Sequence, residues 1–86
     1  MKSYIVTYDL MKPGQNYDSL IAAIKKLPSC SVLLSAWLIR SSSSAREIYD
    51  YLRQYMDSGD FVLVAELVPG NSYGWLKQEA WNFLNK

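Results

Sequence analysis

The sequence predicts an α+β fold in which helices cover one face of a sheet. Segments rich in apolar and β-branched residues alternate along the chain with segments of helical periodicity. The chain has 86 residues, half of them hydrophobic, which suits one compact domain and leaves no room for a second. We therefore expect a single domain over residues 1–86, with residues 1–68 as its core and an aromatic C-terminal helix over residues 71–86.

The first predicted unit is a strand followed by a helix. Residues Tyr4–Leu10 are apolar and β-rich up to Asp9, which indicates a buried central strand. Lys12-Pro13-Gly14 marks a turn, and Asn16 can cap a helix that Pro28 ends. The apolar stripe of this helix consists of Tyr17, Leu20, Ile21, Ile24 and Leu27.

The second unit begins with Ser31–Arg40, which is β-like but long for one strand, so that a reversal at Ser35-Ala36 can divide it into two. Ser44 and Glu47 have the spacing of a capping box, which predicts a helix starting there and running through Met56. If the long segment is a hairpin, the order of elements becomes the βαββαβ of the ferredoxin-like sandwich.

The last predicted elements are one strand and one helix. Asp60–Val68 is a clear apolar strand, and Pro69-Gly70-Asn71 turns the chain after it. Tyr73–Leu84 places apolar residues on one helical face, which predicts a short helix added after the βαββαβ core.

Composition excludes several classes of function. The net charge is +1, so no strong overall field points to nucleic acid, although a local basic patch is compatible with it. The chain has no histidine, which excludes Ser-His-Asp, Cys-His and His-based metal sites. The single cysteine, Cys30, fits a reducing compartment. Because no apolar stretch approaches the ~20 residues of a membrane helix, we expect a cytoplasmic protein without a membrane partner.

Asp9 is the first candidate for chemistry. A carboxylate at the end of a buried strand can hold a hard cation such as Mg²⁺ or Mn²⁺, and a dimer would supply two of them. A bound cation would offset the repulsion between these two carboxylates. The competing structural interpretation, which we favour from the residues alone, is that Asp9 stabilises the Met11–Gly14 turn.

A second candidate is the polar segment between the predicted hairpin and the second helix. Its serine hydroxyls, helix N–H groups and guanidinium groups could hold a phosphate. Lys2 and Lys12, which flank the first strand, could contact a phosphate near Asp9. An ordinary polar loop with a helix cap is the simpler interpretation. The segment consists of Arg40, Ser41, Ser42, Ser43, Ser44, Ala45 and Arg46.

The twelve aromatic residues are many for a chain of this length. Tyr49, Tyr51, Tyr55 and the tryptophans of the C-terminal segment could stack on bases. Aromatic residues at helical spacing more often form a core or an interface, and we expect Trp75, Trp81 and Phe83 to contribute to a subunit contact.

Three segments resemble the CRISPR-associated protein 2 family. Tyr4–Leu10 is similar to its opening strand, which ends in Tyr-Asp and an aliphatic residue. Leu34–Ile39 resembles the segment before its second helix, and Phe61–Val64 resembles its third apolar strand. The resemblance covers residues 1–68 and extends to the small SinR-like branch of a superfamily that includes VapD-type endoribonucleases.

The resemblance implies a ferredoxin-like homodimer in which Asp9 faces its copy and binds the divalent metal ion of a nuclease. This chain departs from the family in its aromatic C-terminal helix, which replaces a strand, and in its sparse basic surface. Two functions therefore stay open. One is a metal-dependent endonuclease acting on RNA or DNA. The other is a non-catalytic dimeric adaptor that binds a protein, nucleotide or nucleic acid, in a phage-defence or toxin–antitoxin setting.

Overall fold

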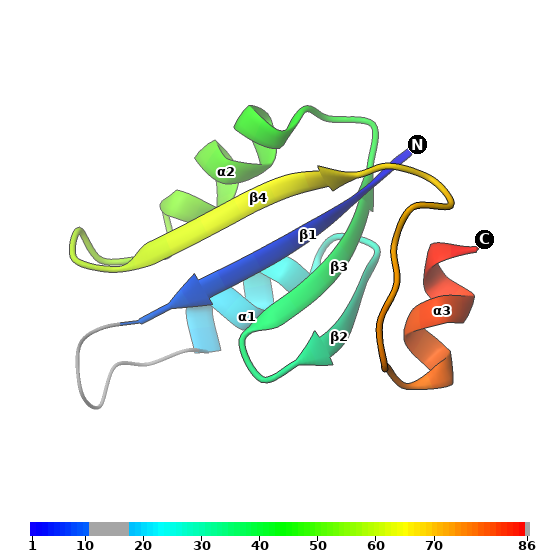
Figure 1. The fold of residues 1–86 in the computed structure, drawn as a ribbon. Coiled ribbons are helices and arrows are strands. Elements are labelled where there is room, and N and C mark those ends of the chain that lie inside the picture. The colour runs from blue at the N-terminus through cyan, green and yellow to red at the C-terminus, as the bar shows by residue number, and fades with distance from the viewer. Residues whose placement is uncertain (11–17, 86) are drawn as a thin grey trace.

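A computed structural model describes residues 1–10 and 18–85 of the chain (Figure 1). Its elements are, in order, β1 (Lys2–Asp9), α1 (Asp18–Lys25), β2 (Ser29–Leu33), β3 (Ala36–Ser41), α2 (Ala45–Arg53), β4 (Phe61–Leu67) and α3 (Gln78–Leu84). The predicted Lys12-Pro13-Gly14 turn, the Asn16 cap and Tyr17 lie outside the described residues.

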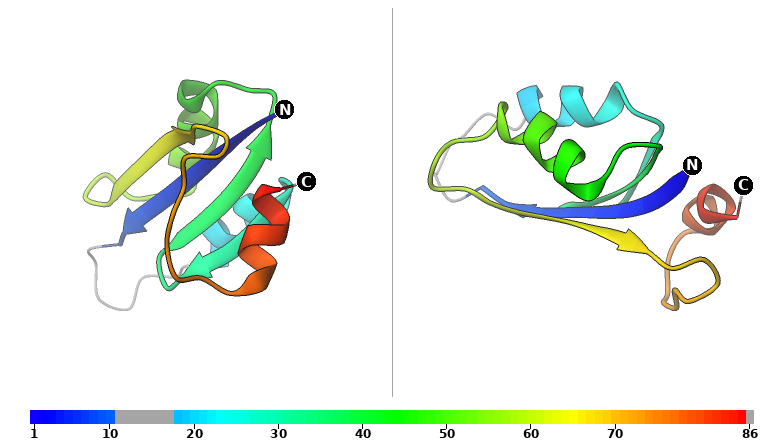
Figure 2. Two further views of the ribbon diagram at one scale, coloured as in Figure 1. Left: turned by 45° about the vertical axis from the view of Figure 1, so that its right-hand side comes forward. Right: turned by 90° about the horizontal axis from the view of Figure 1, so that it is seen from above.

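The four strands form one antiparallel sheet in the order β2-β3-β1-β4. Helices α1 and α2 lie side by side over one face of this sheet, and α3 lies beyond it on the other side (Figures 1 and 2). The βαββαβ order with this strand arrangement is the ferredoxin-like sandwich, so the predicted fold class is confirmed. The prediction that the first strand is an internal strand is also confirmed.

The main core lies between the sheet and the two helices α1 and α2. Alternate side chains of β1 point into it, and Tyr4, Val6 and Tyr8 are buried there. This alternation follows from the period of two in a strand, which sends successive side chains to opposite faces. The helices contribute Leu20, Ala23, Ile24, Ile48 and Leu52, and β3 contributes Ile39.

The reversal predicted within Ser31–Arg40 is present, one residue earlier than expected. Leu34 and Ser35 form the turn between β2 and β3, and Leu34 is fully exposed. A shift in register between Ser31 and Leu33 adds an irregularity before the turn. The hairpin pairs β2 with β3, and β3 pairs in turn with β1.

The predicted capping box of α2 is present, and it starts the helix at Ala45. The helix ends at Arg53, and Tyr55 and Met56 lie in the turns that follow rather than in the helix as predicted. Met56 still packs against the main core. The turn continues to the buried Asp60, whose Oδ2 accepts a hydrogen bond of 2.9 Å from the backbone N–H of Asp57.

Replacing Ser44 by Ala is expected to lower the free energy of unfolding by about 1 kcal/mol, because the N–H of Glu47 loses its capping acceptor. Urea unfolding followed by circular dichroism measures this change. Ser42→Ala is the matched control at an exposed serine of the same loop, and we expect its effect to stay within about 0.5 kcal/mol. Equal effects of the two substitutions would contradict the capping role.

The C-terminal helix is shorter than the sequence predicted. Residues 73–77 are not helical, and α3 begins only at Gln78. The chain has to cross from β4 at one edge of the sheet to β2 and β3 at the other, where α3 packs. An extended backbone spans about twice the distance per residue of a helix, which is what this crossing requires.

Helix α3 completes a second apolar cluster on the far side of the sheet. Ala80 is buried there against Val32, Ala36 and Leu38 of the hairpin. Leu76, Phe83 and Leu84 pack around this centre, and so do Ile5, Cys30 and Leu67 of the sheet. Within the described residues, no helix has the length and apolar character needed to cross a membrane.

Candidate functional site

The face of the sheet opposite α1 and α2, which we call the outer face, is only partly covered. Strand register places Ile5, Thr7 and Asp9 of β1 on this face, because their neighbours Tyr4, Val6 and Tyr8 point into the main core. Helix α3 covers the part formed by β2 and β3. The part formed by the C-terminal end of β1 and the N-terminal end of β4 stays exposed.

This exposed part combines one carboxylate with two large apolar side chains. Asp9 is paired with Phe61, and Thr7 with Leu63, across the antiparallel ladder. Phe61 is 65% exposed and Leu63 is 59% exposed. The four residues line a shallow hollow of about 200 Å³. We call this set of four residues the Asp9 patch.

Asp9 lies at the end of β1, as predicted, with its side chain exposed to solvent. Among the described residues, no hydrogen bond or ion pair holds its carboxylate, and the Met11–Gly14 turn that it could stabilise lies outside them. In residues 1–10 and 18–85, no three carboxylate or thiol groups gather into a metal site. In that part of the structure, one chain therefore offers a cation a single carboxylate at this position.

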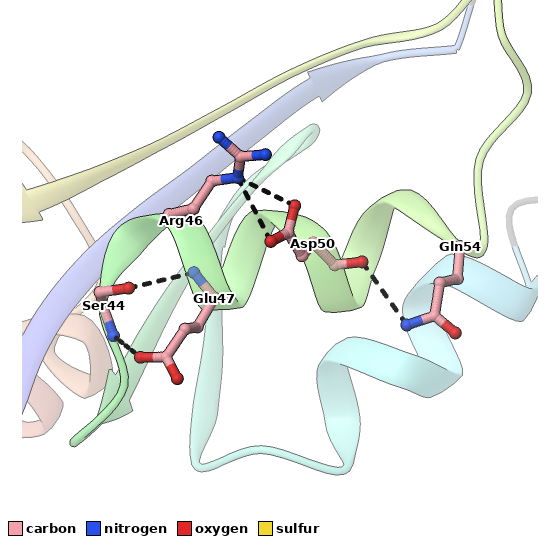
Figure 3. A network of polar contacts seen from close by, with 5 residues as sticks. All are labelled: Ser44, Arg46, Glu47, Asp50 and Gln54. Atoms are coloured by element: carbon pink, nitrogen blue, oxygen red, sulfur yellow. Dashed lines mark hydrogen bonds and ion pairs between the residues drawn. The ribbon is translucent and has the colours of Figure 1, made fainter.

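Several polar groups of residues 40–46, which we call the serine segment, form hydrogen bonds within the chain. Ser41 Oγ accepts one from the N–H of Ser43 at 3.0 Å, and Ser44 Oγ accepts one from the N–H of Glu47 at 3.1 Å. The Glu47 carboxylate in turn accepts a hydrogen bond of 2.8 Å from the Ser44 N–H (Figure 3). The Tyr4 hydroxyl, buried in the main core, donates to the Ser43 carbonyl at 2.6 Å. This arrangement supports the interpretation of the segment as a helix cap.

The two arginines of the predicted phosphate site do not lie together. The Arg46 side chain pairs with Asp50 one helical turn further along α2, at 3.1 Å from Nε to Oδ1 (Figure 3). The Arg40 guanidinium lies 5.8 Å from the centre of the Phe83 ring of α3, on the outer face. The sheet separates the two groups. Lys2 pairs with Glu66 at 3.7 Å, and Lys12 lies outside the described residues.

The aromatic residues that the sequence analysis considered differ in their burial and in their contacts. Tyr51 packs against the main core, donates a hydrogen bond of 2.9 Å to the Ala23 carbonyl and contacts the Tyr55 ring edge-on. Phe83 is half-buried in the second apolar cluster, so that it stabilises the chain itself. Trp75 is fully exposed and Trp81 is half-buried.

Trp75 and Trp81 line a pocket that the sequence did not predict. It has a volume of about 590 Å³ and lies where three parts of the chain meet: the end of β4, α3, and residues 68–77 between them, which we call the crossing segment. Tyr73, also fully exposed, lines it too. A sequence signal was present in the aromatic residues that follow the Pro69-Gly70 turn, but only the packing of α3 on the hairpin brings Trp81 near them.

No protein-family model matches the chain. The fold is similar to the crystal structure of the hypothetical protein TT1823 from Thermus thermophilus. The two structures have a TM-score of 0.64 and 20% sequence identity, and the match covers 88% of this chain and 94% of that chain. At this identity the similarity establishes the shared fold of nearly the whole chain and leaves the function to be argued from the site.

Proposed function

We propose that the chain forms a homodimer through the Asp9 patch and acts as a metal-dependent endonuclease on RNA or DNA. The observation that carries the proposal is the position of Asp9 beside the exposed side chains of Phe61 and Leu63. Burying these two side chains against a second copy removes apolar surface from water, which favours association. The same contact brings two carboxylates toward each other.

A two-fold axis through the patch would bring the two Asp9 carboxylates together at one cation site. In such a contact the same surface meets itself, so each Asp9 lies near its copy. Two carboxylates at short range repel, and a hard divalent cation offsets that repulsion. Their oxygen atoms are the ligand type that Mg²⁺ and Mn²⁺ accept, together with waters and phosphate oxygens. When bound, the cation would supply Lewis-acid activation of the phosphodiester and of the attacking water.

Metal removal tests this proposal directly. We expect light scattering to give the mass of a dimer, and labelled single-stranded RNA or DNA to be cleaved in Mg²⁺ or Mn²⁺ but left intact in EDTA. Adding Mg²⁺ back in excess of EDTA should restore cleavage, because the carboxylates themselves are unchanged by chelation. Cleavage that continues in EDTA, or a monomeric protein that still cleaves, would contradict the two-carboxylate site.

The second candidate function is a dimeric adaptor without turnover, as in a phage-defence or toxin–antitoxin system. It is favoured by one observation: Lys2 and Arg46 are paired with carboxylates of the same chain, and Arg40 packs on Phe83. These cations are less available to hold a polyanion. An adaptor would form the same dimer, cleave neither nucleic acid, and keep its partner when Asp9 is replaced.

A further inference from the structure

We propose that the pocket beside Trp75 and Trp81 binds a flat, uncharged heteroaromatic ring of the nucleobase class. The inference deepens the proposed function and rests on it for its biological meaning, because a nucleobase is the part of a nucleic acid that such a pocket can hold. The ring belongs either to a free nucleoside or to an unpaired base of a single strand. The two sources share the same chemistry at the pocket.

The size and lining of the pocket fit a single ring system with its sugar. Its volume of about 590 Å³ falls within the range of small-ligand sites. Three aromatic side chains line it, of which Tyr73 and Trp75 are 106% and 100% exposed. Solvent-exposed aromatic rings are the groups on which unpaired bases stack, and stacking accepts every base because each has a π face.

The polar groups of the pocket suit a neutral ligand. Of the described residues that line it, none carries a charge, and Ser3, Ser72 and Asn85 supply hydroxyl and amide groups. An amide can donate to and accept from the edge of a base, as a hydroxyl can. Burying an unpaired phosphate among apolar side chains would be costly, so the phosphates of a bound strand would stay outside.

The pocket lies away from the proposed dimer contact. Ser3 lines the pocket and Asp9 belongs to the patch, so the two sites occupy opposite ends of β1. Ser3 and Asp9 are six positions apart along the strand, which corresponds to about 20 Å. The Asp9 patch and the pocket therefore share no lining residue, and a strand bound near Asp9 could place a base further along in the pocket.

Binding measurements on the whole chain test the inference. The probes are adenosine, followed by calorimetry, and a fluorescein-labelled single-stranded oligodeoxyadenylate, followed by anisotropy in EDTA so that no cleavage occurs. Trp75→Ala is expected to weaken binding about tenfold or more, because one stacking partner is lost. The matched control is Leu34→Ala, which removes an equally exposed apolar side chain at the β2–β3 turn. It should bind as the wild type does.

Binding of adenosine that depends on Trp75 supports the inference with a free nucleoside as ligand, and Trp75-dependent binding of the oligonucleotide alone supports it with a base in a strand. The inference is wrong if neither probe binds, or if Trp75→Ala binds as tightly as the wild type. It is also wrong if Trp75→Ala dissociates the dimer, since a second copy then fills the pocket. The proposed function is tested separately, by cleavage in EDTA and by cleavage with Asp9→Asn, and neither test involves the pocket.

Discussion

Replacing Asp9 by Asn is expected to reduce metal-dependent cleavage by about a hundredfold or more, while the variant keeps the fold and dimer mass of the wild type. Asn preserves the shape of the side chain but removes the charge that a divalent cation requires. A metal ion contributes several kcal/mol to stabilising the transition state, so losing it has a large effect on rate. Because Asp9 is exposed at the end of its strand, the substitution leaves the core intact.

The matched control for this prediction is Glu79→Gln, which neutralises another exposed carboxylate, on α3. Its cleavage rate should equal that of the wild type. Calorimetry with Mg²⁺ or Mn²⁺ provides a second readout, in which Asp9→Asn should lose the binding that Glu79→Gln retains. If Asp9→Asn cleaves normally, Asp9 is not a metal ligand and the two-carboxylate site is wrong. If the wild type itself cleaves neither RNA nor DNA, the adaptor becomes the better interpretation.

Asp9 also illustrates which part of a site a sequence can predict. Its position at the end of β1 follows from the apolar run before it, and the alternation of a strand places it opposite to Tyr8. Whether its face of the sheet is covered depends on α3, which is distant in sequence. Pattern alone could not show that α3 packs on the hairpin and leaves Phe61 and Leu63 exposed.

The fold was predictable where the signals are local. The capping box of Ser44 and Glu47 is encoded within four residues, and the structure has it as predicted. The crossing segment is the opposite case. The spacing of its apolar residues predicts a helix, yet residues 73–77 are not helical. The chain has to cross the sheet between β4 and α3, and this requirement outweighs the local preference.

The serine segment shows why motif chemistry needs tertiary structure. Serines and arginines near a helix start are typical of a phosphate site, and they are equally typical of a cap. The structure pairs Arg46 with Asp50 and places Arg40 over the Phe83 ring, on the other side of the sheet from Arg46. Phe83 approaches Arg40 only because α3 packs on the far face of the sheet from α2, and no local pattern contains that information.

Replacing Leu63 by Glu is expected to convert the proposed dimer to a folded monomer. Leu63 is 59% exposed in the isolated chain, so a charged side chain there costs the monomer little. In a dimer formed through the Asp9 patch, the same change buries two carboxylates without partners, close to the two Asp9 side chains. Such burial is costly enough to weaken association by about a hundredfold or more. Sedimentation over a range of protein concentrations measures the shift.

The control for this substitution is Leu34→Glu, which introduces the same charge at the fully exposed β2–β3 turn and should leave the dimer intact. A dimer that persists in Leu63→Glu would place the interface elsewhere, with the surface around Trp75 as the next position to test. Circular dichroism and urea unfolding show whether the monomer keeps its fold.

Mixing Leu63→Glu with Leu63→Lys should restore a mixed dimer, because opposite charges then face each other across the two-fold axis. Leu63→Lys alone should weaken the dimer less than Leu63→Glu does, because its ammonium groups lie near the two Asp9 carboxylates. The mixture also separates the two proposed functions. If cleavage requires two Asp9 side chains, it disappears in Leu63→Glu and returns when this variant is mixed with Leu63→Lys. It should stay absent when the Leu63→Lys member of the mixture also carries Asp9→Asn. A mixed dimer that forms without cleavage would support the adaptor, with the same surface serving assembly alone.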